Sequence, residues 1–174
     1  MKSVLISIQP KYVELIASGK KTIEVRKTVP KGNKPFKVYI YQTKKKWIYR
    51  LLEKLGLYQG KVIGEFICDR ADKQIVFHKG ITRIMILGYK EKLFTLCKAA
   101  ALSLDELHDY IDKDGKDLEL VYGWHISDLK IYDKPKELEE FKKPCPQVGC
   151  TCGTSGACNQ YLTRPPQSWC YVEV

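Results

Sequence analysis

Long apolar segments and targeting signals are missing from this sequence. No run of about 18 consecutive apolar residues is present, which excludes a helix that spans a membrane. The first residues lack the long apolar centre and the small-residue cleavage site of a signal peptide. We therefore expect a cytoplasmic protein, in which the seven cysteines are thiols or metal ligands because the surroundings are reducing.

Familiar catalytic motifs are missing as well. The sequence contains no glycine-rich phosphate loop, no Gly-x-Ser-x-Gly turn and no His-Glu-x-x-His segment. Its three histidines, His78, His108 and His125, are too scattered for metal-ligand spacing. We expect His108 on the surface of an acidic helix and His125 in a structural position on a strand. The composition is that of an ordered globular protein, since 44% of the residues are hydrophobic and 29% are charged.

The whole chain has a formal net charge of +10, and its positive charge is concentrated in one region. Residues 20–61 carry thirteen Lys and Arg against two acidic residues, Glu24 and Glu53. Residues 103–140, by contrast, carry twelve acidic residues and five lysines. A concentrated basic region attracts polyanions, of which nucleic-acid backbones are the commonest. The alternatives are simple solubility and an acidic protein partner.

Hydrophobic periodicity predicts short strands and a few short helices. Helices are expected from Pro10 to Gly19, over Trp47–Leu55, and from the capping box Ser103-Leu-Asp-Glu106 to about Ile111. The expected strands are Lys2–Ile8, Lys21–Lys27, Phe36–Tyr41, Lys61–Cys68, Arg83–Leu87, Val121–Ile131 and Ser168–Val174, with a turn over Thr28–Pro35. Gly64 indicates a bulge or a close approach of another backbone. The pattern is typical of an α+β domain around a mixed or closed sheet.

The sharpest local signal is the segment from Gly19 to Arg26. A glycine-ended helix passes here into a strand expected to be half-buried, and Thr22, Glu24 and Arg26 share one face of that strand. Lys21 has the opposite parity unless the turn rotates it inward. Glu24 and Arg26 can form a buried pair of opposite charges, which serves either as a structural pin or as the floor of a polar pocket.

The segment Ser18–Lys27 (SGKKTIEVRK) resembles the Gly-x-Lys-x-x-Glu-x-Arg signature of ASCH domains, which belong to the PUA-like group of small β-barrels. Four further segments resemble the ASCH proteins of phages and their bacterial hosts. They are Pro35–Lys44, Gly60–Arg70, Tyr122–Phe141 and Arg164–Val174. The resemblance implies a single ASCH domain over residues 1–174. Its fold would be α+β, a small PUA-like barrel of mixed sheet flanked by short helices.

For function, the resemblance implies a pocket that binds RNA or a nucleotide-like ligand, which could carry a modified base, without catalysing a reaction. Aromatic side chains would stack a base, Glu24 would accept from an exocyclic amine, and basic side chains would meet phosphates. The candidate ligand-binding residues are Lys21, Thr22, Glu24, Arg26, Tyr41, Lys44, Lys45, Lys46 and Trp124. Tyr39 and Trp169 could stack a base in the same way. For every aromatic residue, core packing is the alternative.

The alternative class is a hydrolase acting on a modified nucleoside or on RNA. One ASCH branch is an amidohydrolase that removes the acetyl group from N4-acetylcytidine with a lysine, a threonine and a glutamate. Lys21 matches that lysine, but Glu24 stands where the threonine is required, so the hydroxyl nucleophile is missing. Lys21 and Glu24 could still act as an acid–base pair if burial shifted their pKa values. We expect binding rather than catalysis.

Four cysteines lie within a charge-free insertion at about residues 144–163. They are Cys145, Cys150, Cys152 and Cys158. The insertion has too little apolar mass to hold a shape by itself, and four thiolates could fold it around one structural zinc ion. The spacing lacks the Cys-x-x-Cys pairs of common zinc sites, so disulfides in an oxidised preparation and plain disorder remain alternatives. No other cofactor is expected.

The charge distribution generates a prediction about salt. If residues 20–61 contact phosphates, the affinity for labelled single-stranded RNA should fall steeply as salt rises, in proportion to the number of phosphates contacted. A titration at two salt concentrations measures this dependence. Affinity that does not change with salt, or no binding at low salt, would contradict the prediction.

Overall fold

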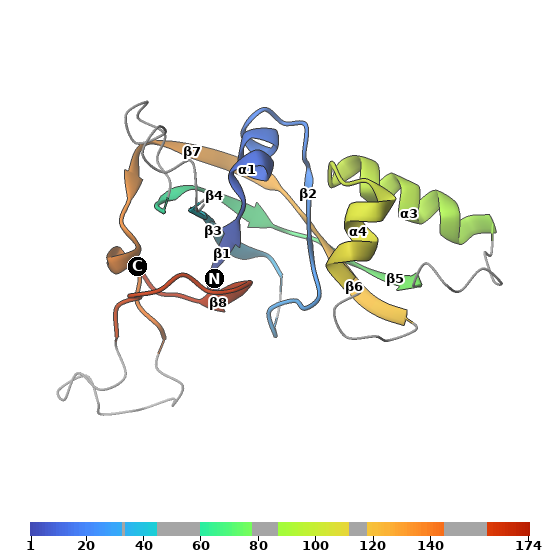
Figure 1. The fold of residues 1–174 in the computed structure, drawn as a ribbon. Coiled ribbons are helices and arrows are strands. Elements are labelled where there is room, and N and C mark those ends of the chain that lie inside the picture. Colours follow the sequence, from blue (N-terminus) through green and yellow to red (C-terminus); the bar gives the residue numbers. More distant parts are fainter. Residues whose placement is uncertain (33, 45–59, 78–86, 112–117, 145–159) are drawn as a thin grey trace. The chain divides into compact units, whose positions relative to one another are not determined.

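The computed structural model describes residues 1–32, 34–44, 60–77, 87–111, 118–144 and 160–174 (Figure 1). These residues form two units, each with a sheet and a core of its own. Unit 1 contains Met1–Glu14, Pro35–Ile67 and Asp128–Val174, and unit 2 contains Leu15–Lys34 and Cys68–Ser127. No helix of the described residues is long and apolar enough to cross a membrane.

Unit 1 is built on a five-stranded mixed sheet with the strand order β7-β4-β3-β1-β8. Its strands are β1 (Ser3–Ile8), β3 (Phe36–Gln42), β4 (Val62–Cys68), β7 (Ser127–Lys136) and β8 (Trp169–Tyr171). β1 pairs with β3 in parallel and with β8 in the antiparallel direction. β1 is an interior strand and is buried on both faces, so its polar Ser7 needs a partner. The Ser7 hydroxyl donates a hydrogen bond to the Pro166 carbonyl at 2.6 Å.

The core of unit 1 brings β1 and β3 together with the C-terminal part of the chain. Tyr39 lies edge-on to Phe141, with ring centroids 4.9 Å apart. The cluster contains Leu5, Tyr39, Tyr41, Val62, Leu138, Phe141, Leu162 and Val172. Leu138 belongs to a short 3-10 helix, Leu138–Glu140, that follows β7. The C-terminal part of the chain thus contributes Leu138, Phe141, Leu162 and Val172 to this core.

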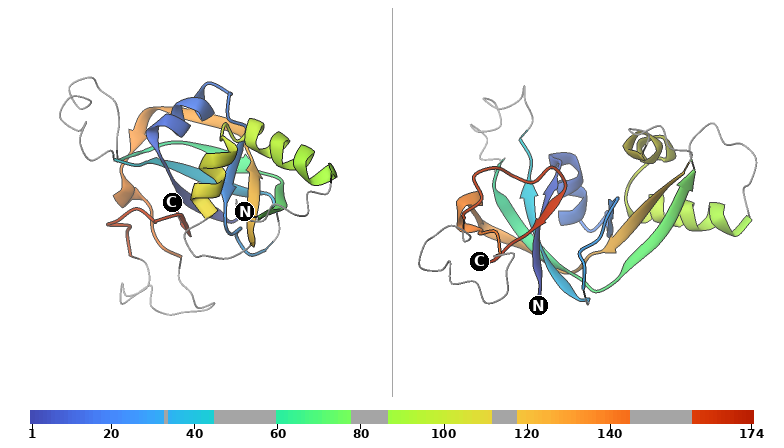
Figure 2. Two further views of the ribbon diagram at one scale, coloured as in Figure 1. Left: turned by 45° about the vertical axis from the view of Figure 1, so that its right-hand side comes forward. Right: turned by 90° about the horizontal axis from the view of Figure 1, so that it is seen from below.

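Unit 2 contains a three-stranded antiparallel sheet with the order β2-β6-β5. Its strands are β2 (Ile23–Arg26), β6 (Leu118–His125) and β5 (Ala71–Phe77), and its helices are α3 (Leu87–Ala99) and α4 (Leu104–Ile111). Helix α1 (Pro10–Ala17) begins in unit 1 and ends in unit 2. Figure 2 shows the three strands of unit 2 side by side, with α3 and α4 against one face of the sheet.

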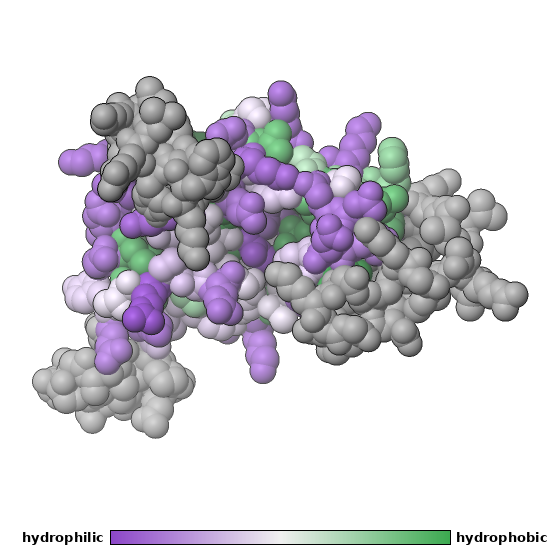
Figure 3. All heavy atoms as spheres, in the orientation of Figure 1, coloured by the Kyte–Doolittle hydropathy of each residue, from purple (hydrophilic) through white to green (hydrophobic). Residues whose placement is uncertain are grey.

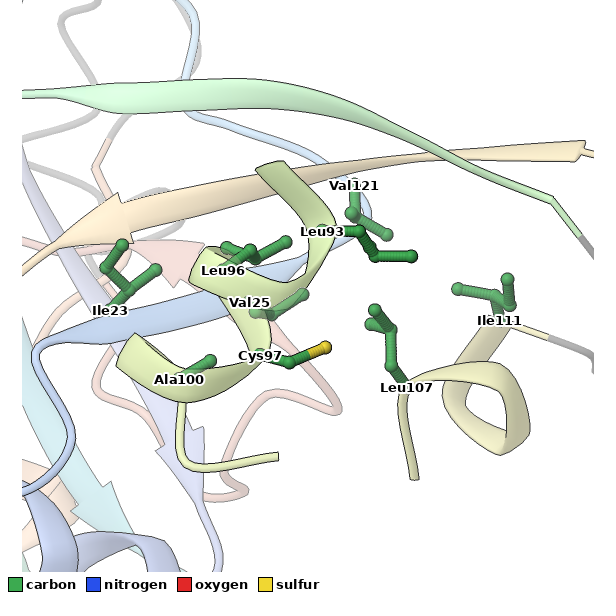
Figure 4. Packing of buried hydrophobic residues seen from close by; sticks show 9 residues of the cluster. All are labelled: Ile23, Val25, Leu93, Leu96, Cys97, Ala100, Leu107, Ile111 and Val121. Atoms are coloured by element: carbon green, nitrogen blue, oxygen red, sulfur yellow. The ribbon is translucent and has the colours of Figure 1, made fainter. Parts of the chain in front are cut away.

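The two helices of unit 2 bury one face of its sheet (Figure 4). Leu93, Leu96 and Cys97 of α3 pack against Ile23 and Val25 of β2 and Val121 of β6 in a single apolar cluster. A Cβ on Gly123 would lie 2.9 Å from the Leu96 side chain and 3.0 Å from Ile23. Glycine at this position therefore allows α3 to approach the sheet closely.

The C-terminus of α3 has every one of its last carbonyls paired. The Leu102 N–H donates to the Cys97 carbonyl and the Ala101 N–H to the Lys98 carbonyl, as in a Schellman motif. Ala101 has the left-handed conformation of this motif, with φ of 50°. The Ala99 carbonyl accepts from the Thr22 N–H, and the Ala100 carbonyl accepts from Lys21 Nζ. The start of β2 thus completes the end of α3.

Most of the predicted elements are confirmed. The helix beginning at Pro10 ends before Gly19, which has φ of 71°. In the predicted capping box, the Glu106 N–H donates to Ser103 Oγ, and the Ser103 N–H donates to Glu106 Oε2. A close approach at Gly64 is also confirmed, because a Cβ there would lie 2.5 Å from the Lys130 carbonyl oxygen.

Three predictions about elements were wrong or incomplete. The single strand predicted over Val121–Ile131 is two strands in different sheets, β6 and β7, and the Ile126 N–H between them donates to the Thr22 carbonyl. β2 is buried on both faces, not half-buried, because its polar face carries buried charges. β5 and α3 were not predicted, although Leu93, Leu96, Cys97 and Ala100 have helical spacing.

Some predictions fall outside the described residues. The helix predicted over Trp47–Leu55 lies there, as do residues 83–86 of the strand predicted to end at Leu87, where α3 begins. The fold class is confirmed as α+β with mixed sheets and helices. The strand pairings of the described residues make two sheets, and closure into a barrel stays a prediction.

The left-handed residue at the end of α3 can be tested with glycine. Ala101→Gly should raise the free energy of unfolding by about 1 kcal/mol, because a Cβ costs roughly 1–2 kcal/mol in this conformation and the freer unfolded chain offsets part of the gain. The matched control Ala99→Gly, inside α3, should lower it by about 1 kcal/mol. Urea denaturation measures both, and a destabilised Ala101→Gly variant would contradict the prediction.

Candidate functional site

The residues of the predicted motif are positioned by the chain between α1 and β2. Gly19 reverses the direction of the chain, and the Lys21 N–H donates to the Leu15 carbonyl at 2.9 Å. This bond folds Lys21 back against the end of α1, so its side chain turns inward and leaves the expected strand parity. β2 then pairs with β6, placing Glu24 opposite Trp124 and Arg26 opposite Tyr122.

Lys21, Glu24 and Arg26 form a buried cluster of charges in unit 2. Glu24 Oε1 lies 2.9 Å from Arg26 Nη2, and Glu24 Oε2 lies 3.3 Å from Lys21 Nζ. Only 3% of Lys21, 7% of Glu24 and 8% of Arg26 is exposed to solvent. Each carboxylate oxygen of Glu24 therefore already has a cationic partner, as a carboxylate buried to this extent requires.

Lys21 also serves the C-terminus of α3. Its Nζ donates to the Ala100 carbonyl at 2.6 Å, where the partial negative charge of the helix end favours a cation. Burial lowers the pKa of Lys21, and Glu24 opposes that shift, while Glu106 of α4 raises the pKa more weakly. The ammonium has two close acceptors, and this arrangement is that of a bound cation rather than a free amine.

The cluster holds two cations and one anion, so it carries excess positive charge inside unit 2. Its chemistry suits electrostatic attraction of an anion better than nucleophilic attack. Within the described residues, no group of three or more His, Cys, Asp and Glu side chains could hold a metal ion. The four cysteines of the predicted zinc site, Cys145, Cys150, Cys152 and Cys158, lie outside the described residues.

The other candidate residues are divided between the surface and the two cores. In unit 2, Thr22 is exposed, and Trp124 is completely buried. In unit 1, Tyr39 and Tyr41 are buried in the apolar cluster, so core packing accounts for both rings. Lys44 is exposed in unit 1. Lys45 and Lys46 lie outside the described residues.

Unit 2 also contains a polar cluster around His125 that the sequence pattern did not predict. His125 Nε2 lies 2.7 Å from Asp72 Oδ2, and Arg70 Nη2 lies 3.1–3.2 Å from both ring nitrogens of His125. Arg70 Nε is also 3.4 Å from the same Asp72 oxygen. Because Asp72 and Arg70 belong to the unpredicted β5 region, the sequence pattern gave His125 no partners. The structural position expected for His125 fits this network.

Comparisons with known proteins identify one family. The family model described as ASCH domain matches residues 6–144. No curated protein matches the chain. A crystal structure of ASCH from Zymomonas mobilis resembles it with 20% identity and a TM-score of 0.59, covering 99% of this chain and 88% of that chain. Two point variants of that protein resemble it at TM-scores of 0.58 and 0.60 and 19% and 20% identity, covering 99% of this chain and 91% and 89% of theirs. At these identities, the likeness shows the fold alone.

The buried charge cluster generates a prediction about stability. Glu24→Gln leaves Arg26 and Lys21 buried without their counter-charge, so the free energy of unfolding should fall by about 3–5 kcal/mol. The matched control is Glu137→Gln, because Glu137 pairs with Lys61 at 2.6 Å with side chains 55% and 36% exposed. That exposed pair should contribute at most about 1 kcal/mol. Thermal and urea denaturation compare the two variants, and equal small losses would show that Glu24 is not a structural pin.

Proposed function

This chain belongs to the ASCH domain family, and from that premise we propose that it binds RNA or a nucleotide-like ligand without catalysing a reaction. The observation that carries the proposal is the concentration of positive charge in residues 20–61. In unit 2, Lys20, Lys31 and Lys34 of this region are exposed. Exposed lysines in the same unit as a net-positive buried cluster are suited to phosphate contacts.

The buried cluster limits how a base can be read. Both oxygens of Glu24 are occupied by Arg26 and Lys21, so a base amine would have to compete with those cations for the carboxylate. Trp124 likewise has no exposed surface on which a base could stack. We therefore assign the first contacts of the ligand to exposed lysines. Base contacts at Glu24, Arg26 and Trp124 require these side chains to become accessible when the ligand binds.

The proposal is tested by comparing two sets of lysines in the same unit. A triple variant, Lys20→Gln, Lys31→Gln and Lys34→Gln, removes three exposed charges from the basic region. The matched control, Lys73→Gln, Lys92→Gln and Lys98→Gln, removes three exposed charges of unit 2 outside that region. Fluorescence anisotropy with labelled single-stranded RNA should give weaker binding for the first variant only. The slope of log affinity against log salt should become shallower by about 0.7 for each phosphate that the variant no longer neutralises.

Equal effects of the two triple variants would mean that only total charge matters, and the proposed site would be wrong. No binding by the unsubstituted protein at low salt would overturn the proposed function itself.

The second candidate function, hydrolysis of a modified nucleoside, is favoured by one observation, the lowered pKa of the buried Lys21. A lysine needs such a shift to act as a base near neutral pH. The surroundings oppose that role, because the ammonium donates to the Ala100 carbonyl and lies 3.3 Å from the Glu24 carboxylate. Both contacts favour the protonated form, which has no lone pair for attack.

We therefore predict no appreciable deacetylation of N4-acetylcytidine by the purified protein. A carboxylate at Glu24 can act as a base, but it cannot replace a hydroxyl nucleophile without forming an anhydride-like intermediate. Chromatographic detection of cytidine is the assay, and Lys21→Ala is the control. Turnover that disappears in Lys21→Ala would establish the hydrolase alternative.

A further inference from the structure

The last strand of unit 1 carries two aromatic side chains outside the apolar cluster that contains Tyr39 and Phe141. Trp169 and Tyr171 are alternate residues of β8, which forms one edge of the five-stranded sheet (Figure 1). Both side chains are partly exposed, and their ring centroids lie 5.3 Å apart at an interplanar angle of 89°. Because the rings are perpendicular, they do not stack face to face on each other.

The neighbouring residues of the strand show on which face of the sheet these rings lie. Cys170 packs against the apolar cluster of unit 1, and Val172 belongs to it. Side chains of a strand alternate between its two faces, so Trp169 and Tyr171 must point away from that cluster. Directly paired residues point to the same face of a sheet, so the pairing of Val4 with Tyr171 and of Ile6 with Trp169 places both rings on the face that carries Val4 and Ile6. Val4 and Ile6 are fully buried, and the two rings lie beside them on the edge strand, where they are partly exposed.

A third aromatic residue follows the same alternation. Tyr161 is 54% exposed, whereas the next residue, Leu162, is buried in the core. The backbone of Lys142 bridges Tyr161 on one side and Glu173 on the other. Tyr161 and the end of β8 are therefore joined through one short backbone segment of unit 1.

Lysines accompany these rings. Lys2 Nζ lies 5.7 Å from the Tyr171 ring centroid, and Lys142 Nζ lies 4.8 Å from that of Tyr161. Lys143 is exposed and lies within electrostatic range of Cys170. Only Glu173 among the residues paired in this segment is acidic. Cations that lie over rings at the surface attract a polyanion that also carries flat bases.

We propose that Trp169, Tyr171 and Tyr161 form a stacking surface for the bases of single-stranded nucleic acid, with Lys2 and Lys142 meeting its phosphates. The proposal rests on the proposed function and adds a surface outside residues 20–61. It assigns base contacts to the exposed ring of Tyr161 and the partly exposed rings of Trp169 and Tyr171, in contrast to Tyr39, Tyr41 and Trp124, which are buried. Stacking accepts any base, so this surface supplies affinity with little sequence preference.

The test compares a normal oligonucleotide with one that has no bases. Labelled oligouridine and an abasic ribose-phosphate oligomer of equal length carry the same charge, so their ratio of affinities isolates stacking. The full-length protein should bind the oligouridine more tightly. Trp169→Leu should weaken that binding about tenfold, Tyr161→Leu should weaken it less, and both should leave abasic binding unchanged.

The matched control is Tyr12→Leu. Tyr12 is also a partly exposed tyrosine with a lysine over its ring, since Lys11 Nζ lies 4.7 Å from the centroid, but it belongs to α1. This variant should bind both oligomers like the unsubstituted protein. Thermal melts of every variant show whether a loss of binding comes from a loss of folding. Tyr161→Leu provides a second test of the surface at a highly exposed position.

The outcomes distinguish this inference from the function on which it rests. No binding of either oligomer at low salt would overturn the proposed function and this surface with it. Equal affinity for the two oligomers, or unchanged oligouridine binding by folded Trp169→Leu and Tyr161→Leu, would overturn the stacking surface alone. As a second readout, RNA should shift the ¹⁹F resonance of fluorinated Trp169, identified by its loss in Trp169→Leu. An unchanged Trp169 resonance at saturation would also overturn the surface.

Discussion

A single ammonium group joins the helices of unit 2 to the strand that carries its motif. Lys21 Nζ donates to the Ala100 carbonyl at the end of α3 and lies 3.3 Å from Glu24 of β2. The Thr22 N–H pairs with the Ala99 carbonyl beside it. Without these two contacts, the end of a 13-residue helix would bury unpaired carbonyls against the sheet. The position of α3, and with it the apolar cluster of unit 2, depends on this junction.

The same junction supports the proposal that the signature residues serve binding rather than attack. Lys21 and Arg26 share one carboxylate, so each cation has a carboxylate oxygen as its partner while the cluster as a whole keeps one positive charge. A lysine in these surroundings is held as a cation by its acceptors, although burial lowers its pKa. In the proposed function, its contribution to a ligand is a fixed electrostatic field. In the proposed binding mode, direct contacts are assigned to the exposed lysines. Hydrophilic residues are spread over the face seen in Figure 3, with hydrophobic residues between them.

Aromatic residues of unit 1 separate into two groups by strand parity. Tyr39 and Tyr41 belong to one apolar cluster, and Trp169 and Tyr171 lie on the opposite face of the sheet, partly exposed, because Cys170 and Val172 face that cluster. The cysteine-rich insertion does not interrupt this arrangement. Its two flanks are joined where the Lys143 N–H donates to the Gln160 carbonyl and the Leu162 N–H to the Phe141 carbonyl. The core of unit 1 thus closes through residues on either side of the insertion.

Local patterns sufficed for much of this description. Pro10 and Gly19 mark the limits of α1, Ser103 and Glu106 mark the start of α4, and the Glu24–Arg26 pair follows from strand parity. Each of these features depends on residues a few positions apart, where backbone geometry alone decides which side chains meet. The family resemblance came from the same short-range signal, the Gly-x-Lys-x-x-Glu-x-Arg segment.

Long-range contacts decided the remainder. The continuous pattern of Val121–Ile131 is divided because Ile126 bonds to Thr22, more than a hundred residues earlier in the chain. The inward-turned ammonium of Lys21 finds its acceptor at a helix end 79 residues away. The aromatic residues Trp124 and Trp169 look alike in sequence, yet one is buried and the other partly exposed. The sequence by itself determined which residues could carry charge, stack or end a helix; only the tertiary structure decided which of them are buried, because burial depends on what the distant chain places against each side chain.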